Sequence, residues 1–311
     1  MNKLQVGQRV VLNPWLSCEP RGITPVCAAC QRGELYLCEN FTSGSLPTGM
    51  HIGNCSPITG GFAPLFAAHQ SQLFPIPSTL SFDQAVLSDP FSVSLHATLK
   101  APPVAGGLAL VYGCGTLGLL TIAILKNLYP QTSIIAIARY PHQEEWARKM
   151  GAQHVIRTKR PVEIIEKIAE IAGTKIYQPW NGKPMLMGGV NVIYDTIGSP
   201  ETIETDIRMV QPRSKVVITG VANPARFEWT PLYFKEIELI GSNAFGIETF
   251  EGQRLHAMQI YLNLLEQNRL DLADIITHRF PLDQYRPAFL AAHQKIKSAA
   301  VKVVFEYPNR S

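Results

Sequence analysis

The sequence lacks several features that would place it in a special class of proteins. Its longest apolar stretches, near residues 108–111 and 117–125, fall short of the roughly 18 residues of a membrane helix, so we expect no membrane partner. The opening MNKLQVGQRVVLNP has no extended apolar segment, so we expect no export signal and a cytoplasmic protein. Charged residues make up only 17%, with a net charge of +4 and no basic stripe with interleaved aromatics, which argues against nucleic-acid binding.

The composition fits a globular protein with a sizeable core. The chain has 311 residues, of which 46% are hydrophobic, and this length accommodates about two domains. Residues 1–97 have an irregular, β-rich pattern with many glycines and prolines. Residues 98–246 alternate short apolar runs with amphipathic stretches, and residues 247–311 form a tail with further helical and strand patterns.

The alternating region predicts a parallel sheet covered by helices on both faces. The expected strands are Leu108–Tyr112, Ser133–Ala138, His154–Ile156, Val190–Tyr194, Lys215–Thr219 and Ile237–Ile240. The expected helices between them include Thr116–Leu128, His142–Met150 and Val162–Ala172, and Ile176–Gly189 has the pattern of an inserted loop. Outside this region we expect a strand at Val6–Leu12, a helix starting after Ser81, a long helix at Gly252–Asn268, a helix near Gln284–Gln294 and a strand at Val301–Phe305.

Four of the six cysteines lie in one Pro- and Gly-rich segment, at Cys18, Cys27, Cys30 and Cys38. The C-x2-C pair allows two thiolates of one turn to bind the same tetrahedral zinc, and the outer two cysteines complete a four-sulfur set. Such a closed shell leaves no position for water or substrate, so the zinc would be structural. The alternatives are unrelated thiols or two disulfides, and the expected reducing compartment argues against disulfides.

A dinucleotide-binding pattern follows the strand at Leu108–Tyr112. It is a G-x-G-x-x-G sequence that runs directly into a helical stretch and comprises Gly113, Gly115, Thr116, Leu117 and Gly118. The glycines permit a tight turn, a close approach of the pyrophosphate and close helix–strand packing, and the phosphates meet the helix N-terminus. A plain strand–helix turn is the alternative, but the strand before the motif and the β/α series after it favour the cofactor site.

The second strand of this series bears on which dinucleotide binds. An NAD site usually has Asp or Glu about twenty residues beyond the last glycine, to accept a hydrogen bond from the ribose 2′-OH. The chain has Ala138 there, followed by Arg139. The missing carboxylate and the guanidinium favour a 2′-phosphate, and hence NADP over NAD. The alternative is that Arg139 is only a solvated surface arginine.

Taken together, these motifs resemble the zinc-containing medium-chain alcohol dehydrogenases, a family that includes sorbitol and threonine dehydrogenases. The resemblance covers essentially the whole chain. Val6-Gly7-Gln8-Arg9-Val10 is similar to the V-G-D-R-V strand of the family, and Cys27, Cys30 and Cys38 keep the spacing of its structural-zinc lobe, with six extra residues after Cys18. Further matching segments are Gly60–Ala63, Asp89–Phe91, His96–Ala97 and Thr277–Leu282.

The resemblance implies a fold and a reaction. The fold is α/β, a Rossmann doubly wound parallel sheet at residues 98–246 plus a β-rich GroES-like catalytic domain formed by residues 1–97 and 247–311. The reaction is hydride transfer between a small-molecule alcohol or polyol and NAD or NADP, in a homo-oligomer, either a dimer or a tetramer. The resemblance also places further residues at the cofactor, namely Thr196, Ile197, Gly198, Thr219, Gly220, Val221, Ser242 and Asn243.

The chain departs from the family at the catalytic zinc. Asp89 occupies the position of the third ligand, whereas the C-G-T-D-like and G-H-E stretches that carry the other two do not occur in this sequence. We therefore expect an incomplete catalytic domain, without its N-terminal part, and impaired zinc chemistry, since a catalytic zinc needs about three protein ligands. His51, His69 and His96 are expected to be packed or surface histidines. The alternative functions are a non-catalytic nucleotide-binding protein and a zinc-independent quinone or alkene reductase.

Overall fold

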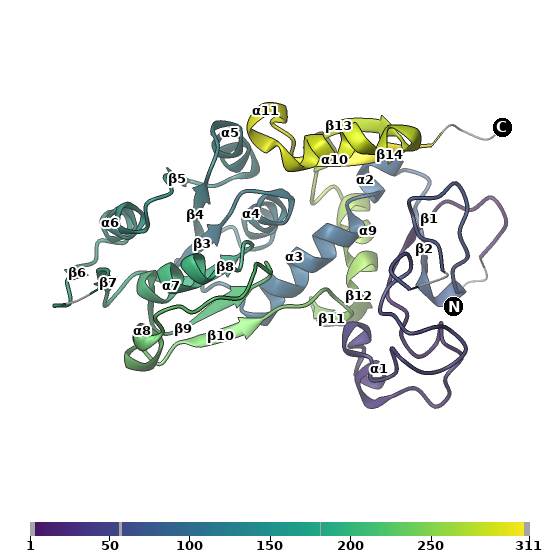
Figure 1. Cartoon of the computed structure of the whole chain (residues 1–311), viewed down its shortest axis with the longest axis horizontal. Helices are drawn as coiled ribbons and strands as arrows, with labels where there is room; N and C mark the ends of the chain where they lie inside the picture. The colour runs from purple at the N-terminus through teal and green to yellow at the C-terminus, as the bar shows by residue number, and fades with distance from the viewer. Residues whose placement is uncertain (1–3, 56–57, 181, 308–311) are drawn as a thin grey trace. The chain divides into compact units, whose positions relative to one another are not determined.

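The structure, a computed structural model, describes residues 4–55, 58–180 and 182–307. It divides into two compact units (Figure 1). Unit 1 comprises Met1–Ser92 and Ala244–Ser311, and unit 2 comprises Val93–Asn243. Within the described residues, no helix is both long and apolar enough to pass through a membrane.

Unit 2 is built on a six-stranded sheet in which every neighbouring pair is parallel. The strand order is β10-β9-β8-β3-β4-β5. From β3 the chain adds β4 and β5 on one side and then returns to add β8, β9 and β10 on the other side, so the switch point lies between β3 and β8. In an open α/β sheet, ligands bind beyond the carboxyl ends of the strands at this switch point. The strands are β3 (Leu108–Tyr112), β4 (Ser133–Ala138), β5 (His154–Arg157), β8 (Val190–Asp195), β9 (Val210–Ile218) and β10 (Glu238–Gly241).

Two pairs of packed helices, α4 with α5 and α6 with α7, cover the sheet of unit 2 (Figure 1). Alternate strand residues such as Leu110 and Ile135 belong to one core cluster with Ile164 and Ile168 of α6. Because successive strand side chains point to opposite faces, their neighbours Ala109 and Ile134 face the other layer. The helices of the unit are α4 (Thr116–Leu128), α5 (Pro141–Met150), α6 (Pro161–Ala172), α7 (Pro200–Met209) and α8 (Thr230–Phe234).

The predicted doubly wound α/β class is therefore confirmed, and most predicted elements of unit 2 lie within one or two residues of the observed ones. Two details differ. Strand β9 begins at Val210, five residues before the predicted start, because the extended chain continues directly from the end of α7. The expected loop Ile176–Gly189 contains a short antiparallel pair, β6 (Ile176–Tyr177) and β7 (Met185–Leu186).

Unit 1 contains small sheets and short helices. Its strand pairs are antiparallel β1 (Val10–Leu12) with β2 (Leu73–Pro75), antiparallel β11 (Ile247–Phe250) with β12 (Gln253–His256), and parallel β13 (Ile276–Pro281) with β14 (Lys302–Glu306). Its helices are α1 (Ala28–Arg32), α2 (Phe82–Ala85), α9 (Ala257–Glu266), α10 (Tyr285–His293) and α11 (Lys295–Ser298). Short 3₁₀ turns occupy Leu35–Leu37, Gln70–Gln72, Ala273–Ile275 and Leu282–Gln284, and α3 (Ser88–Lys100) runs across the boundary between the units.

Two predicted elements of unit 1 are wrong in extent. The strand predicted at Val6–Leu12 is limited to Val10–Leu12, which pairs with β2. The helix predicted at Gly252–Asn268 begins only at Ala257, because Gln253–His256 instead pairs with β11. The predicted N-cap is confirmed, since the Ser81 hydroxyl accepts the Gln84 amide in a capping box.

Candidate functional site

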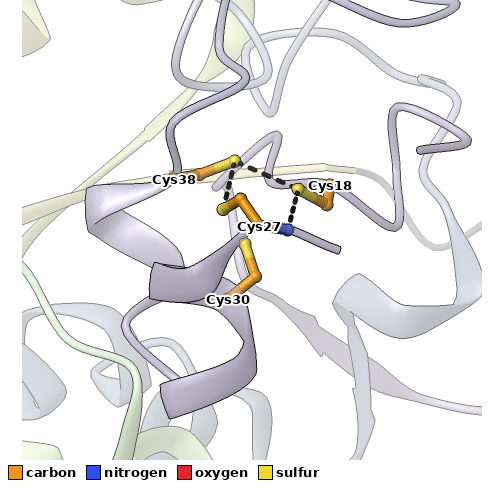
Figure 2. A group of neighbouring side chains, drawn as sticks. All are labelled: Cys18, Cys27, Cys30 and Cys38. Atoms are coloured by element: carbon orange, nitrogen blue, oxygen red, sulfur yellow. Dashed lines mark hydrogen bonds between the residues drawn. The ribbon is translucent and has the colours of Figure 1, made fainter. Parts of the chain in front are cut away.

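The four predicted metal ligands lie together in unit 1. Cys27 and Cys30 come from the start of α1, Cys18 and Cys38 come from the flanking loops, and the four sulfurs converge (Figure 2). All four lie within 4.8 Å of one another, with 3.6 Å between Cys18 and Cys38 and 4.0 Å between Cys27 and Cys38. A tetrahedral zinc with Zn–S bonds of about 2.3 Å requires sulfurs about 3.8 Å apart, so this arrangement fits a structural zinc.

Backbone and side-chain amides point at these sulfurs. The Cys18 sulfur accepts from the Cys27 amide at 3.3 Å and from Asn40 Nδ2 at 3.2 Å, and the Glu39 amide donates to the Cys27 sulfur at 3.5 Å. Burial raises the pKa of Cys27, but the amides of Glu39 and Cys30 outweigh it and lower the pKa to about 7. Such donors stabilise the thiolate of Cys27, whereas burial raises the pKa of Cys30 and raises that of Cys38 to about 11, so these two thiols would lose their protons only on binding a metal.

Arg21 lies in the eight-residue segment between Cys18 and Cys27 and is completely buried. Its five N–H groups donate to five backbone carbonyls. They are those of Leu16 at 2.8 Å, Ser43 at 2.9 Å, Leu46 at 3.0 Å, Pro47 at 3.0 Å, and Gly49. The arginine of this segment therefore holds the backbone of residues 43–49 in place.

Asp89, the position of a catalytic-zinc ligand in the resemblance, lies in the first turn of α3. Burial raises its pKa, and the positive charge of Lys302 opposes this rise. Both residues belong to unit 1, where Asp89 lines a cavity of about 830 Å³ together with residues of β1, α2 and β14. Asp89 thus has a cation as its charged neighbour, and among the described residues it belongs to no group of three or more metal-binding side chains.

The histidines do not assemble a second metal site. Across residues 4–55, 58–180 and 182–307, the four cysteines are the single group of three or more ligand side chains close enough to share an ion. His51 bonds to Asn54 Nδ2 at 2.8 Å and packs edge-on against Trp15, and His69 caps the turn at Gln70–Gln72. His96 is buried within α3.

The glycine motif sits at the switch point of the unit 2 sheet. Gly113 follows β3 with a φ of +94°, and Gly115 is the N-cap of α4. A Cβ on Gly118 would lie 1.8 Å from the Gly113 carbonyl oxygen, so only glycine permits this contact between turn and helix. The amides of Thr116 and Leu117 belong to the first turn of α4, where helix N–H groups are available to an anion.

The turn after β8 packs directly against this motif, and the turn after β9 packs against the turn after β8. A Cβ on Gly113 would lie 2.8 Å from the Thr196 hydroxyl oxygen, and one on Gly198 would lie 2.0 Å from the Gly220 carbonyl oxygen. The Thr219 amide donates to the Asp195 carbonyl at 2.9 Å. The structure therefore brings together the predicted cofactor residues of three strands, and these contacts leave no room for larger side chains at the glycines.

Ser242 follows β10 in unit 2. Its side chain is 8% exposed, and its hydroxyl has no hydrogen-bond partner among the described residues. Its amide donates to the Ile218 carbonyl at 2.9 Å, which holds it beside the end of β9. A buried, unsatisfied hydroxyl costs free energy, and a polar ligand at the carboxyl ends of the strands would satisfy it. Together with the glycine turns, it fits a dinucleotide.

Arg139 is exposed just after β4, with its guanidinium carbon 5.4 Å from the centre of the Tyr140 ring. The register pairs Ala138 of β4 with Arg157 of β5, so the residues that follow both strands lie at one edge of the sheet. Arg157 is paired with Glu144 at 2.9 Å, whereas Arg139 has no carboxylate partner among the described residues. Arg139 is thus a cation available to an anionic ligand.

Sequence reasoning missed two acidic residues beside these turns. Asp195 is the last residue of β8 and Asp206 lies on α7, and the side chains of both are completely buried. Asp195 directly precedes the predicted cofactor residue Thr196, so its position in the sequence was the available signal. Its contact with Asp206 depends on the packing of α7 against β8, which no local pattern reveals.

Comparison with known proteins identifies two family models in the chain, an alcohol dehydrogenase GroES-like domain at residues 1–78 and a zinc-binding dehydrogenase domain at residues 116–258. Sorbitol dehydrogenase of Bacillus subtilis is 26% identical over 310 residues, which cover 100% of this chain and 77% of that protein. L-threonine 3-dehydrogenase of Rhizobium johnstonii is 29% identical over 293 residues, covering 94% of this chain and 73% of that protein. A zinc-binding dehydrogenase structure from Sinorhizobium meliloti, bound to NADP, has a TM-score of 0.72 at 24% identity and covers 99% of this chain and 79% of that chain.

Proposed function

The chain belongs to the zinc-binding dehydrogenase family, the zinc-type medium-chain alcohol dehydrogenases, and from this membership we propose that it is an NAD(P)-dependent oxidoreductase of an alcohol or polyol. The observation that carries the proposal is the packing of Gly113, Gly118, Gly198 and Gly220 at the switch point of the unit 2 sheet. The named relatives are dehydrogenases, which favours this function over a non-catalytic nucleotide-binding protein or a quinone or alkene reductase.

The residues of the chain have distinct roles in this proposal. A bound nicotinamide cofactor supplies hydride chemistry, while the protein binds and orients it. The first turn of α4 binds the pyrophosphate through its amides, which the glycines leave accessible. Thr196, Thr219 and Ser242 border the cofactor at the carboxyl ends of β8, β9 and β10. The cysteine lobe holds a structural zinc that takes no part in the chemistry.

The described residues do not fit a catalytic zinc. Asp89 provides one carboxylate, its charged neighbour is Lys302, and no second group of metal ligands is present among those residues. We therefore expect turnover of primary, secondary and polyol substrates, followed by NAD(P)H absorbance, to change by less than about twofold on adding zinc. A complete catalytic zinc site would stabilise the transition state by several kcal/mol, so adding zinc would then raise turnover by far more than twofold.

Two outcomes would contradict these proposals. Zinc-dependent turnover that Asp89→Asn abolishes, while the matched Asp83→Asn variant in the same cavity retains it, would mean that a complete catalytic metal site exists. Failure of the chain to bind either reduced dinucleotide in a fluorescence titration would contradict the oxidoreductase function itself.

We also propose that the chain prefers NADP(H), with Arg139 on the 2′-phosphate. The support is Ala138 in place of an acid, together with an exposed guanidinium that lacks a carboxylate partner among the described residues. Arg139→Ala is expected to weaken NADPH binding by roughly 1.5–3 kcal/mol, the scale of a charged hydrogen bond, and to leave NADH binding nearly unchanged. Fluorescence titration with both reduced cofactors measures this difference.

Arg148→Ala is the matched control, since Arg148 is an exposed arginine of α5 paired with Glu144 at 3.1 Å. It should leave both dissociation constants within about twofold, as expected for a surface ion pair. Tighter binding of NADH than of NADPH by the parent, or an equal loss of both cofactors in Arg139→Ala, would disprove the preference.

A further inference from the structure

The Asp195 carboxylate organises the turn that follows β8. Its Oδ1 accepts the Ile197 amide at 2.8 Å and the Gly198 amide at 3.0 Å, and its Oδ2 accepts the Thr202 hydroxyl at 2.7 Å. Thr202 lies in the first turn of α7, where it also forms a capping box with Ser199. One carboxylate therefore joins the end of a strand, the turn and the start of the next helix.

Asp206 presents a second carboxyl to the first. It lies four residues after Thr202, so the two residues share a face of α7. Asp206 is completely buried, and neither of its oxygens has a donor among the described residues. Helix α7 packs against β8, and Thr202, one turn before Asp206, bonds to Asp195, so the two carboxyls lie side by side and interact. Two carboxylates cannot bond to each other unless one of them carries a proton, so a proton lies between Asp206 and Asp195.

The surroundings assign this proton to Asp206. Burial, followed by the charge of Asp195, raises the pKa of Asp206 well above its ordinary value. Burial also raises the pKa of Asp195, but the Thr202 hydroxyl and the Gly198 and Ile197 amides oppose this rise, so Asp195 keeps the charge, which the N-terminus of α7 also favours. Protonated Asp206 thus supplies the fourth donor to the Asp195 carboxylate.

The other titratable groups around the pair are few. Burial raises the pKa of Tyr112 on β3, and the negative charge of the aspartate pair and that of Glu201 on α7 act in the same direction. Arg208 and Lys235 lie at the far end of α7, where Arg208 pairs with Glu228 and Lys235 donates to backbone carbonyls. The core cluster around the neighbouring Ile207 is hydrophobic, with residues of α6, β7 and β9. No cation among the described residues neutralises the pair.

The turn held by Asp195 is the middle one of the three that meet at the cofactor motif. The Thr196 hydroxyl bonds to the Tyr112 carbonyl at 3.0 Å, and a Cβ on Gly220 would lie 2.3 Å from the Ile197 carbonyl carbon. A shift of this turn would therefore displace the turns after β3 and β9. We propose that Asp195 and Asp206 share a proton and act as a positioning pair that holds these turns for the dinucleotide, an inference that rests on the proposed function.

Cofactor titration tests the positioning role. Asp195→Asn keeps the shape of the side chain but replaces one acceptor oxygen by a donor and removes the charge. We expect it to raise the dissociation constants of both NADPH and NADH by about tenfold or more, the factor that corresponds to one charged hydrogen bond. Thr202→Val removes one donor at nearly constant volume and should raise both dissociation constants by a smaller factor. It is the variant to measure if Asp195→Asn does not fold. Affinities equal to those of the parent in both variants would overturn the positioning role.

The pH dependence of stability tests the shared proton on cofactor-free protein. Asp206 is neutral when folded and ionised when unfolded between about pH 4 and its raised folded pKa, so the parent loses stability as pH rises through this window. The unfolding constant of the parent relative to that of Asp206→Asn should rise with pH above about pH 4, by up to tenfold per pH unit while Asp206 stays neutral in the folded state. The ratio of the parent's unfolding constant to that of Glu166→Gln, an exposed control on α6, should stay constant over the same pH range.

The two measurements separate the proposals. A flat ratio of parent to Asp206→Asn would overturn the shared proton, because a purely structural side chain takes up no proton on folding. A parent that binds neither dinucleotide would overturn both the proposed function and the positioning role, whereas the pH comparison would still decide on the proton. A parent that binds the cofactors, alongside variants that bind them equally well, would overturn the positioning role alone.

Discussion

Replacing Cys27 and Cys30 together by serine is expected to reduce the zinc content from about one per chain to none and to unfold the lobe around α1. The four sulfurs lie within 4.8 Å of one another, and the lobe has only the five-residue helix α1 and a 3₁₀ turn as regular structure. The apparent free energy of zinc binding at such sites is about 10–16 kcal/mol, and it is largely the folding free energy of the lobe. Elemental analysis measures the metal, and limited proteolysis between residues 18 and 49 measures the unfolding.

Cys55→Ser is the matched control for this loss. Cys55 is a buried cysteine of the same unit that donates to the Pro47 carbonyl at 3.1 Å and does not belong to the metal cluster. Serine keeps the donor, so the control should retain about one zinc and resist proteolysis. Retention of zinc by the double variant, or its equal loss from Cys55→Ser, would disprove the assignment of the four cysteines as ligands.

Arg21→Met is expected to destabilise the same lobe by about 3–5 kcal/mol. Methionine fills much of the space, but it leaves five backbone carbonyls without their donors, and each buried unsatisfied group costs about 1–3 kcal/mol before water returns to it. Arg21→Lys should recover only part of the loss, because an ammonium has three donors and no planar fork. Denaturant titration followed by zinc release to a chromogenic chelator measures the change.

Arg32→Ala provides the comparison for Arg21. Arg32 is an exposed arginine at the end of α1, and its ion pair with Glu34 lies at the surface. Its removal should change stability by less than about 0.5 kcal/mol, because surface pairs contribute little. A similar small change in Arg21→Met would show that water replaces the five donors readily and that the loop of residues 43–49 does not depend on the guanidinium.

The fold of unit 2 could be predicted because its signals are local. Strands β3 and β4 were predicted with their observed bounds, since each is a short apolar run ended by a turn or a polar residue. Helix α4 was also predicted with its observed bounds, because it begins directly at the glycine motif. Parallel strands follow from the alternation of strands and helices, whereas the strand order that places the switch point beside Gly113 comes from the structure.

The start of α9 was missed for an identifiable reason. Glu251 and Gly252 both have positive φ, 48° and 77°, and form a two-residue turn between β11 and β12. Such a turn favours residues like Asn or Asp before glycine, and Glu is a weak signal there. The amphipathic pattern of α9 therefore extended backwards over β12 in the prediction, whereas His256 caps the helix by accepting the Met258 amide at 3.3 Å.

The candidate site was predicted where the chemistry follows from sequence spacing. The glycines and cysteines carry their function in residue type and separation, so Gly113, Gly118 and the C-x2-C pair were recognisable. The role of Asp195 and Asp206 depends on a contact between two elements and on a proton that neither residue would bind by itself, so residue type and spacing do not reveal it. Arg21 escaped notice for a similar reason, because its five partners lie in segments up to 28 residues away.

The cage of carbonyls around Arg21 also determines how the chain can be divided. The N–H groups of one side chain reach Leu16 on one side and Gly49 on the other, and the zinc ligands Cys27 and Cys38 lie between these ends. A helix can form from a short peptide, but this assembly requires the whole stretch of backbone at once, since the carbonyls that bind Arg21 come from both ends of the stretch. In a chimera with a relative, a junction placed anywhere from residue 16 to residue 49 would separate the arginine from its carbonyls, so the segment can be exchanged only as one piece.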